Sequence, residues 1–248
     1  MARSRKKRHQ IQFNILPQPD DATCGPTCLH ALYDHSGDTL ELDQVVREVP
    51  RLKTGGTLGV FLGTHALRRG YRVTIYTYNL LVFDPTWFTY DREKLIAKLA
   101  AQAKAKRSAK LKLASRAYTT FLRLGGEVRF TPLSGRLIRR YLNRDRPILT
   151  GLSSTYLYGC AREYGPNDDS DDIRGLPAGH FVVLCGYDRR ERQVIVADPL
   201  RSNPHSPTHR YSIDMDRVLS SILLGVLTYD ANLLIIEKPA PAADPDRA

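Results

Sequence analysis

The sequence predicts an α+β fold with an antiparallel sheet. Helical patterns come mainly first along the chain and neighbouring strand patterns come last, an order typical of helices packed against an antiparallel sheet. Of the 248 residues, 42% are apolar, which is enough for a packed globular core.

The helical patterns are bounded by glycine and capping signals. The clearest begins at Cys24, carries Cys24, Cys28, Leu32 and His35 along one stripe, and ends before Gly37. Residues 92–124 hold strong helix formers without Pro or Gly and predict a long helix or a helix pair, with the thinnest apolar stripe around residues 103–107. Further helices are expected over residues 42–49, 57–69, 133–142 and 214–224.

The strand patterns are short apolar runs rich in β-branched and aromatic residues. They are expected over residues 71–79, 146–152, 179–188, 193–199 and 232–238. The charged turn "DRRER" joins the third and fourth of these runs into a hairpin. The polar segment "NDDSDD", residues 167–172, lacks the ligand spacing of an EF-hand and is expected to be a solvated loop.

The net charge of +11 is unevenly distributed along the chain. Residues 1–10 carry +5 and residues 92–124 carry +9, which leaves −3 for the remainder. We therefore expect a basic disordered tail over residues 1–11, one domain over residues 12–238 with a basic helical insertion at about residues 90–125, and a disordered tail over residues 239–248. Contact with a polyanion is expected through the tail and the 92–124 segment.

No apolar run approaches the length of a membrane-spanning helix, and the basic start has no apolar stretch behind it. The four cysteines show no spacing typical of a disulfide framework or a zinc site. We expect a cytoplasmic protein without membrane contact, metal or organic cofactor.

Cys24 lies in "QPDDATCGPTC", at the start of the first helix. A thiol attacks as its thiolate, which the unpaired N–H groups and the dipole of a helix N-terminus stabilise. Gly25 would let a reactant approach the backbone, and Pro26 fits the first turn because its missing N–H needs no partner there. A buried core cysteine is the alternative interpretation.

A thiolate nucleophile needs a base. Five of the seven histidines lie in the tail, on the helix of Cys24 or in a Pro/Ser loop: His9, His30, His35, His205 and His209. Of the other two, His65 and His180, only His180 begins a strand, in "AGHFVVLCGYD". A hairpin centred near residue 189 places His180 opposite Asp198 of "QVIVADPL", where a carboxylate holds an imidazole in position.

The oxyanion that forms during acyl transfer needs hydrogen-bond donors. Gln18 precedes Cys24 by six residues, and its amide is expected beside the thiol together with the Cys24 backbone N–H. An exposed loop glutamine is the alternative.

These motifs resemble papain-like cysteine peptidases, most closely the bacteriocin-processing peptidases that cut double-glycine leaders and their stand-alone relatives. The resemblance implies a papain-like fold over about residues 12–237, with Gln18, Cys24, His180 and Asp198 as the catalytic residues. The transporter-borne members are shorter than this chain and are fused to membrane and ATPase segments.

The sequence thus predicts a cysteine peptidase or amidase that hydrolyses a peptide or protein substrate through a thioester. An acyl transferase or amide ligase on the same fold is one alternative, because an amine can replace water as the acceptor. A nucleic-acid or ribosome-associated binding protein with a vestigial site is the other. Cys28 is expected to be a packed core side chain and Cys185 to be inert, whereas Cys160 and the oligomeric state receive no assignment.

Overall fold

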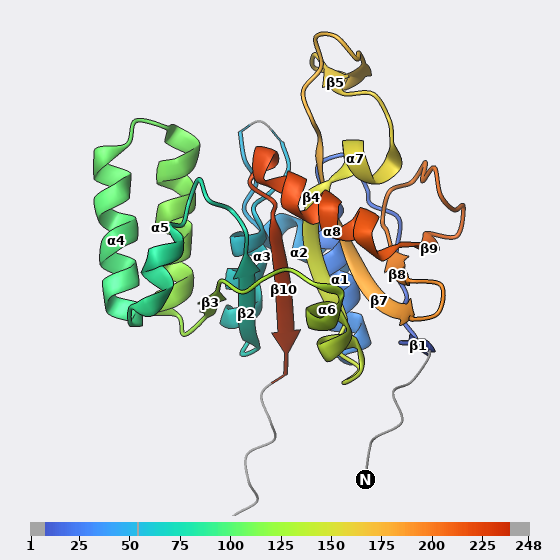
Figure 1. Ribbon diagram of the computed structural model, residues 1–248, viewed down its shortest axis with the longest axis horizontal. Coiled ribbons are helices and arrows are strands. Elements are labelled where there is room, and N and C mark those ends of the chain that lie inside the picture. Colours follow the sequence, from blue (N-terminus) through green and yellow to red (C-terminus); the bar gives the residue numbers. More distant parts are fainter. Residues whose placement is uncertain (1–7, 54, 239–248) are drawn as a thin grey trace, which may run out of the picture.

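The computed structural model describes residues 8–53 and 55–238. An eight-stranded sheet forms its centre, in the order β3-β2-β10-β4-β7-β8-β9, with β1 paired to β7 (Figure 1). Only the β2–β3 pair is parallel among the described strands. The strands of this sheet are β1 (Arg8–Gln10), β2 (Arg72–Thr77), β3 (Glu127–Arg129), β4 (Ile148–Ser153), β7 (Gly179–Asp188), β8 (Gln193–Ala197), β9 (Arg210–Asp214) and β10 (Asn232–Glu237).

Helices cover both faces of the sheet. In Figure 1, α1 (Cys24–His35), α2 (Leu42–Glu48) and α3 (Gly59–Arg68) lie behind it, and α6 (Gly135–Leu142) and α8 (Met215–Leu224) lie in front. The short α7 (Ser154–Tyr158) leads into a projecting hairpin made of β5 (Glu163–Tyr164) and β6 (Asp169–Ser170), so the polar 167–172 loop contains a strand. Two 3₁₀ segments, η1 (Pro85–Thr89) and η2 (Gly225–Thr228), complete the described elements.

The basic 92–124 segment is a helix pair, α4 (Arg92–Ala105) and α5 (Ala109–Arg123). Asp91 and Ser108 each accept a hydrogen bond as the N-cap of their helix, and the chain breaks between the helices where the apolar stripe is thinnest. Helix α5 packs against α3, so the pair lies at the side of the sheet (Figure 1).

Five strands lie where none was expected: β1, β3, β5, β6 and β9. Arg8–Gln10 form β1 on β7, and Ile11 is buried, so residues 8–11 are not part of a disordered tail. Residues 1–7 and 239–248, the remainder of the two expected tails, lie outside the described residues. Strand β9 begins directly after the Pro/Ser loop of His205 and His209, and its alternating buried residues Tyr211 and Ile213 form a strand pattern.

The register of the β7–β8 hairpin differs from the expected one. Val183 pairs with Ala197, and a bulge interrupts the ladder between Leu184 and Gly186. His180 and Asp198 are therefore offset by two positions and do not face each other directly. A shift of two keeps both side chains on the same face of the sheet, whereas a shift of one would separate them.

Within the described ranges, no helix combines the length and the apolar character needed to cross a bilayer.

Candidate active site

Cys24 is the first residue of α1, and its side chain is 7% exposed. A tight turn precedes it, in which the Thr23 hydroxyl donates to the Asp20 carbonyl oxygen at 2.8 Å and accepts from the Asp20 N–H at 3.1 Å. No side chain caps the helix, and its first turn holds no acidic residue. The positive end of the helix dipole is therefore not neutralised by a carboxylate beside the thiol.

Gly25 allows α1 to approach its neighbours closely. A Cβ atom on Gly25 would lie 2.8 Å from Cγ2 of Thr57 and 3.2 Å from both Leu62 and Phe181. The expectation that Gly25 leaves room for a reactant is wrong, because these side chains fill the space. The glycine instead brings Cys24 close to the start of β7, where Phe181 follows His180.

His180 and Asp198 form a buried pair. The Nε2 atom of His180 lies 2.9 Å from Oδ1 of Asp198, and the two side chains are 7% and 0% exposed. Burial acts to lower the pKa of His180, but the charges of Asp198 and Cys24 and hydrogen bonds to both outweigh it and raise the pKa to about 10. Because Nε2 contacts the carboxylate, Nδ1 is the ring nitrogen left for the thiol.

Asp198 is held by four hydrogen bonds. Oδ1 accepts from His180 and from the Leu200 N–H at 3.1 Å, and Oδ2 accepts from the hydroxyls of Tyr158 and Tyr211, each at 2.8 Å. Burial acts to raise the pKa of Asp198, but His180 and the other donors outweigh it and hold the pKa at about 2. The carboxylate is ionised and fixed in orientation.

This role of the two tyrosines was not expected from the sequence. Tyr158 is the last residue of α7, and Tyr211 lies in the unexpected strand β9. The alternation of β9 was the available signal for Tyr211. No local pattern marks Tyr158, which reaches Asp198 across 40 residues of sequence.

Gln18 is 2% exposed and is anchored to the loop that follows Asp198. Its N–H donates to the Pro199 carbonyl oxygen, and its own carbonyl oxygen accepts from Nε of Arg201, both at 2.8 Å. The side-chain Oε1 is buried without a hydrogen-bond partner among the described residues. An exposed loop glutamine is thereby excluded.

The remaining candidates lie apart from this pair. Cys28 is fully buried, donates to the Phe181 carbonyl oxygen at 3.2 Å, and has a pKa raised first by burial and then by the charges of Cys24 and Asp198. Cys185 is buried and Cys160 is exposed. His65 has a structural environment, with Nδ1 2.8 Å from the Tyr33 hydroxyl and Nε2 2.9 Å from Glu48. In the part of the chain that the structure describes, no three His, Cys, Asp or Glu side chains are grouped to hold a metal ion.

A helix that begins with a cysteine, packed on an antiparallel sheet whose neighbouring strand begins with a histidine, is the architecture of papain-like cysteine peptidases. A model of the Peptidase_C39 like family matches residues 10–218. The chain therefore belongs to the Peptidase_C39 like family and is a cysteine peptidase.

Several solved structures are similar to this chain at low sequence identity. A C39-like peptidase from Bacillus anthracis aligns with a TM-score of 0.50 at 11% identity, covering 95% of this chain and 100% of that chain. Xylellain, a cysteine protease from Xylella fastidiosa, aligns at 0.47 and 13% identity over 95% of this chain and 87% of its own. The peptidase domain of Streptococcus ComA aligns at 0.44 and 13% identity over 92% of this chain and 100% of its own. A comparison with curated protein sequences finds no match.

Proposed function

We propose that Cys24, His180, Asp198 and Gln18 carry out hydrolysis of a peptide or amide bond through a thioester intermediate. The observation that carries this proposal is the buried His180–Asp198 pair, whose raised histidine pKa depends in part on Cys24. A histidine linked on one side to an ionised carboxylate and on the other to a thiol is the arrangement that thiol acyl transfer requires.

The reaction begins with the Cys24 sulfur as thiolate and His180 as imidazolium. The sulfur attacks the substrate carbonyl carbon, and the tetrahedral oxyanion accepts hydrogen bonds from the Gln18 side-chain amide and the Cys24 N–H. The C–N bond then breaks, and His180 gives its proton to the leaving amine. A water molecule next loses a proton to His180 and attacks the thioester, which releases the acid and regenerates the thiolate.

Asp198 keeps its negative charge throughout this cycle. Its pKa of about 2 means that it accepts the Nε2 hydrogen bond without taking the proton. The carboxylate therefore fixes the ring so that Nδ1 points toward the sulfur, and it stabilises the imidazolium.

A library of defined peptides with mass-spectrometric detection of new termini tests the proposal. Cleavage is expected with the wild-type protein. In Cys24→Ala and in His180→Ala, kcat/KM should fall by at least about 1,000-fold. Cys160→Ala is the control and should keep full activity, because it removes an exposed cysteine outside the site. Cleavage that persists in Cys24→Ala would overturn the assignment.

The same library separates hydrolysis from acyl transfer. With an added primary amine, a hydrolase gives the free acid as its main product, whereas a transferase or ligase gives the amide. A main amide product that depends on Cys24 would keep the nucleophile and replace hydrolysis by transfer.

A further inference from the structure

Arginine is concentrated in two segments that the fold brings together. Residues 136–146, on and after α6, and residues 189–192, in the turn between β7 and β8, contain eight arginines, no lysine and two acidic residues. We call these two segments the arginine surface. It was not expected from the sequence, which directs attention to the tail and to residues 92–124.

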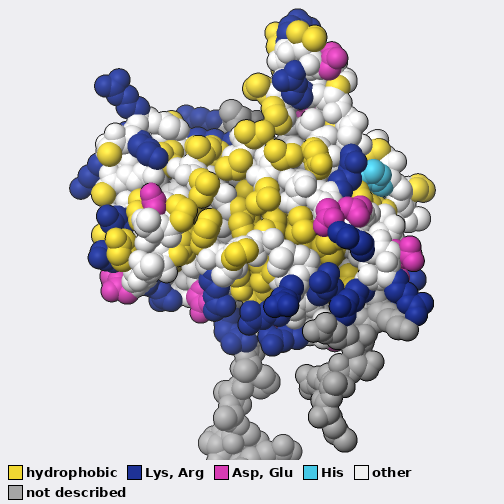
Figure 2. Space-filling model, viewed as in Figure 1, with side chains coloured by type: hydrophobic (Ala, Val, Ile, Leu, Met, Phe, Trp, Pro, Cys, Tyr) yellow, Lys and Arg dark blue, Asp and Glu magenta, His cyan; other side chains and the backbone are white. Residues whose placement is uncertain are grey.

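Strand β7 organises the arginine surface. Helix α6 packs against β7, and the 189–192 turn is its direct continuation. Arg8 pairs with Asp188 at the end of the same strand, which adds a further basic residue beside the turn. Figure 2 shows Lys and Arg side chains gathered along the lower edge of the molecule, where Figure 1 places α6 and the end of β7.

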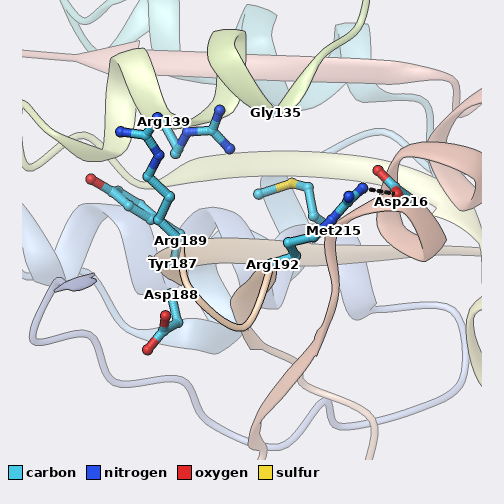
Figure 3. Close-up of a pocket in the computed structure, with 8 residues that line it drawn as sticks. All are labelled: Gly135, Arg139, Tyr187, Asp188, Arg189, Arg192, Met215 and Asp216. Carbon is cyan, nitrogen blue, oxygen red and sulfur yellow. Dashed lines mark hydrogen bonds and ion pairs between the residues drawn. The ribbon is translucent and has the colours of Figure 1, made fainter. Parts of the chain in front are cut away.

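A hollow of about 330 Å³ lies between α6 and the turn. Arg139 of α6 and Arg189 of the turn both line it and extend into the same part of it (Figure 3). Arg192 lines another part and pairs with Asp216 at 2.5 Å. Guanidinium groups that share a hollow repel each other, and an anion between them relieves that repulsion.

Much of the positive charge on the arginine surface has no acidic partner. Five of its arginines are exposed and form no ion pair with any residue in the described ranges: Arg136, Arg140, Arg144, Arg189 and Arg190. Arg140 lies over the Tyr141 ring, 5.9 Å from its centroid, and lysines of the helix pair also lie over aromatic rings, with Lys94 3.8 Å from the Tyr90 centroid and Lys110 4.7 Å from that of Tyr229.

We propose that the arginine surface binds the phosphodiester backbone of a nucleic acid, without regard to base sequence. Arginine suits phosphate because its planar fork makes paired hydrogen bonds to two oxygens. No large exposed apolar side chain lies within either segment, so the surface offers nothing to insert into a bilayer. It also exposes no aromatic side chain on which a base would stack.

This binding is separate from the proposed peptide hydrolysis. His180 lies near the start of β7 and Asp188 ends it, so the two sites are about 26 Å apart along an extended strand. The arginine surface would hold the enzyme on a polyanion, while the active site at the other end of β7 would remain accessible to a peptide substrate.

Fluorescence anisotropy with a labelled DNA duplex of about 20 base pairs, over a series of KCl concentrations, tests the proposal. The test variant is Arg136→Gln/Arg140→Gln/Arg189→Gln/Arg190→Gln. The matched control is Lys104→Gln/Lys106→Gln/Arg107→Gln/Arg116→Gln, which removes the same charge from exposed positions of α4, α5 and their connection.

The wild-type protein is expected to bind with an affinity that falls steeply as salt rises. The test variant should lose at least about tenfold in affinity and flatten the slope of log K against log salt by about 3 to 4, because each lost phosphate contact contributes about 0.9. The control should keep most of the affinity, and both variants should retain the wild-type peptidase rate.

Three results would overturn the proposal. The first is that the wild-type protein does not bind the duplex at low salt. The second is that the test and control variants lose equal affinity for the duplex. The third is that the protein binds phosphatidylserine vesicles but not the duplex. The last result would assign the surface to a membrane.

Discussion

Asp198 is the residue on which the polar contacts of the site converge. Its two oxygens accept four hydrogen bonds, from His180, Leu200, Tyr158 and Tyr211, and the side chain has no exposed surface. Each oxygen has two acceptor positions, so the carboxylate is saturated and has a single orientation. In the proposed mechanism the tyrosines therefore act through Asp198 and are positioning residues.

Replacing either tyrosine by phenylalanine should slow catalysis more than it weakens substrate binding. We expect Tyr158→Phe and Tyr211→Phe each to lower kcat by about tenfold with little change in KM, because each removes one hydrogen bond to a charged group. Steady-state kinetics on a cleaved peptide measures this.

Tyr33→Phe is the matched control for these variants. It removes a buried tyrosine hydroxyl that contacts His65, away from the candidate site, and should lower stability without changing kcat. An equal fall in kcat for all three variants would show that the effect is one of general stability.

Cys24, His180 and Asp198 were predictable as candidates because each stands beside a local signal. These signals are a helix start, a strand start and a strand end before proline. The tyrosines were not predictable in the same way, because their role depends on three elements meeting around one carboxylate. The spacing of residues along the sequence does not predict which elements pack together around Asp198.

At the scale of elements, the contact between α1 and β7 sets the geometry of the site. Gly25 follows Cys24 in α1, and Phe181 follows His180 in β7. Gly25 and Phe181 pack closely against each other because Gly25 has no side chain. The distance between the thiol and the imidazole therefore depends on close packing at one glycine.

Gly25→Ala should separate the two elements. The new Cβ would lie 2.8 Å from the Thr57 methyl group, so we expect a loss of about 1–3 kcal/mol in the free energy of unfolding together with a loss of activity. Denaturant titration and peptide cleavage measure the two effects.

The rescue of Gly25→Ala by Thr57→Ser tests the stated cause. Serine lacks the clashing methyl group but keeps the hydroxyl that donates to the Pro50 carbonyl oxygen at 2.7 Å. The double variant should recover part of both stability and activity. If it is no better than Gly25→Ala alone, the steric explanation fails.

The elements themselves were largely predictable, because periodicity and glycine stops mark most helices and apolar runs mark most strands. The hairpin register was not, since the turn is centred between Arg190 and Glu191 instead of near residue 189, and a bulge near Cys185 then shifts the pairing by one residue. The approximate pairing still kept His180 and Asp198 on one face, because the error was an even number of positions. Strand β1 was missed because its basic residues suggested a tail.

At the scale of the whole molecule, three buried groups govern how stability depends on pH. The raised pKa of His180 stabilises the fold below its ordinary value of 6.5 and loses this effect as pH rises toward about 10. The lowered pKa of Asp198 stabilises it above 3.8 and loses this effect as pH falls toward about 2.

Asp230, unlike His180 and Asp198, destabilises the fold at pH values above its ordinary pKa. Burial raises the pKa of Asp230 to about 7, although Thr228, Lys110 and His180 act to lower it, and its Oδ1 has no hydrogen-bond partner among the described residues. Stability is therefore lost as pH rises from 3.8 through 7, because ionisation of the buried carboxyl is unfavourable. The three groups together place maximum stability near pH 4, where Asp198 is ionised, His180 is protonated and Asp230 is still protonated in the fold.

Asp230→Asn should raise the melting temperature at about pH 8 by several degrees and have little effect at about pH 4, where Asp230 is protonated in the fold. Thermal unfolding followed by circular dichroism at both pH values measures the difference. A gain that is equal at the two pH values would show that ionisation is not its cause.

In the proposed mechanism Cys24 and His180 act as one unit, so the rate of Cys24 alkylation depends on His180. Iodoacetamide labelling at about pH 6, resolved by peptide mass mapping, compares Cys24 with the exposed Cys160 in the wild-type protein and in His180→Ala. We predict that Cys24 reacts at least about tenfold faster than Cys160 and that His180→Ala abolishes this advantage. A limit of access alone would make Cys24 react faster in His180→Ala, because the variant opens space. If Cys24 reacts no faster than Cys160 and the variant leaves its rate unchanged or higher, the catalytic account is contradicted.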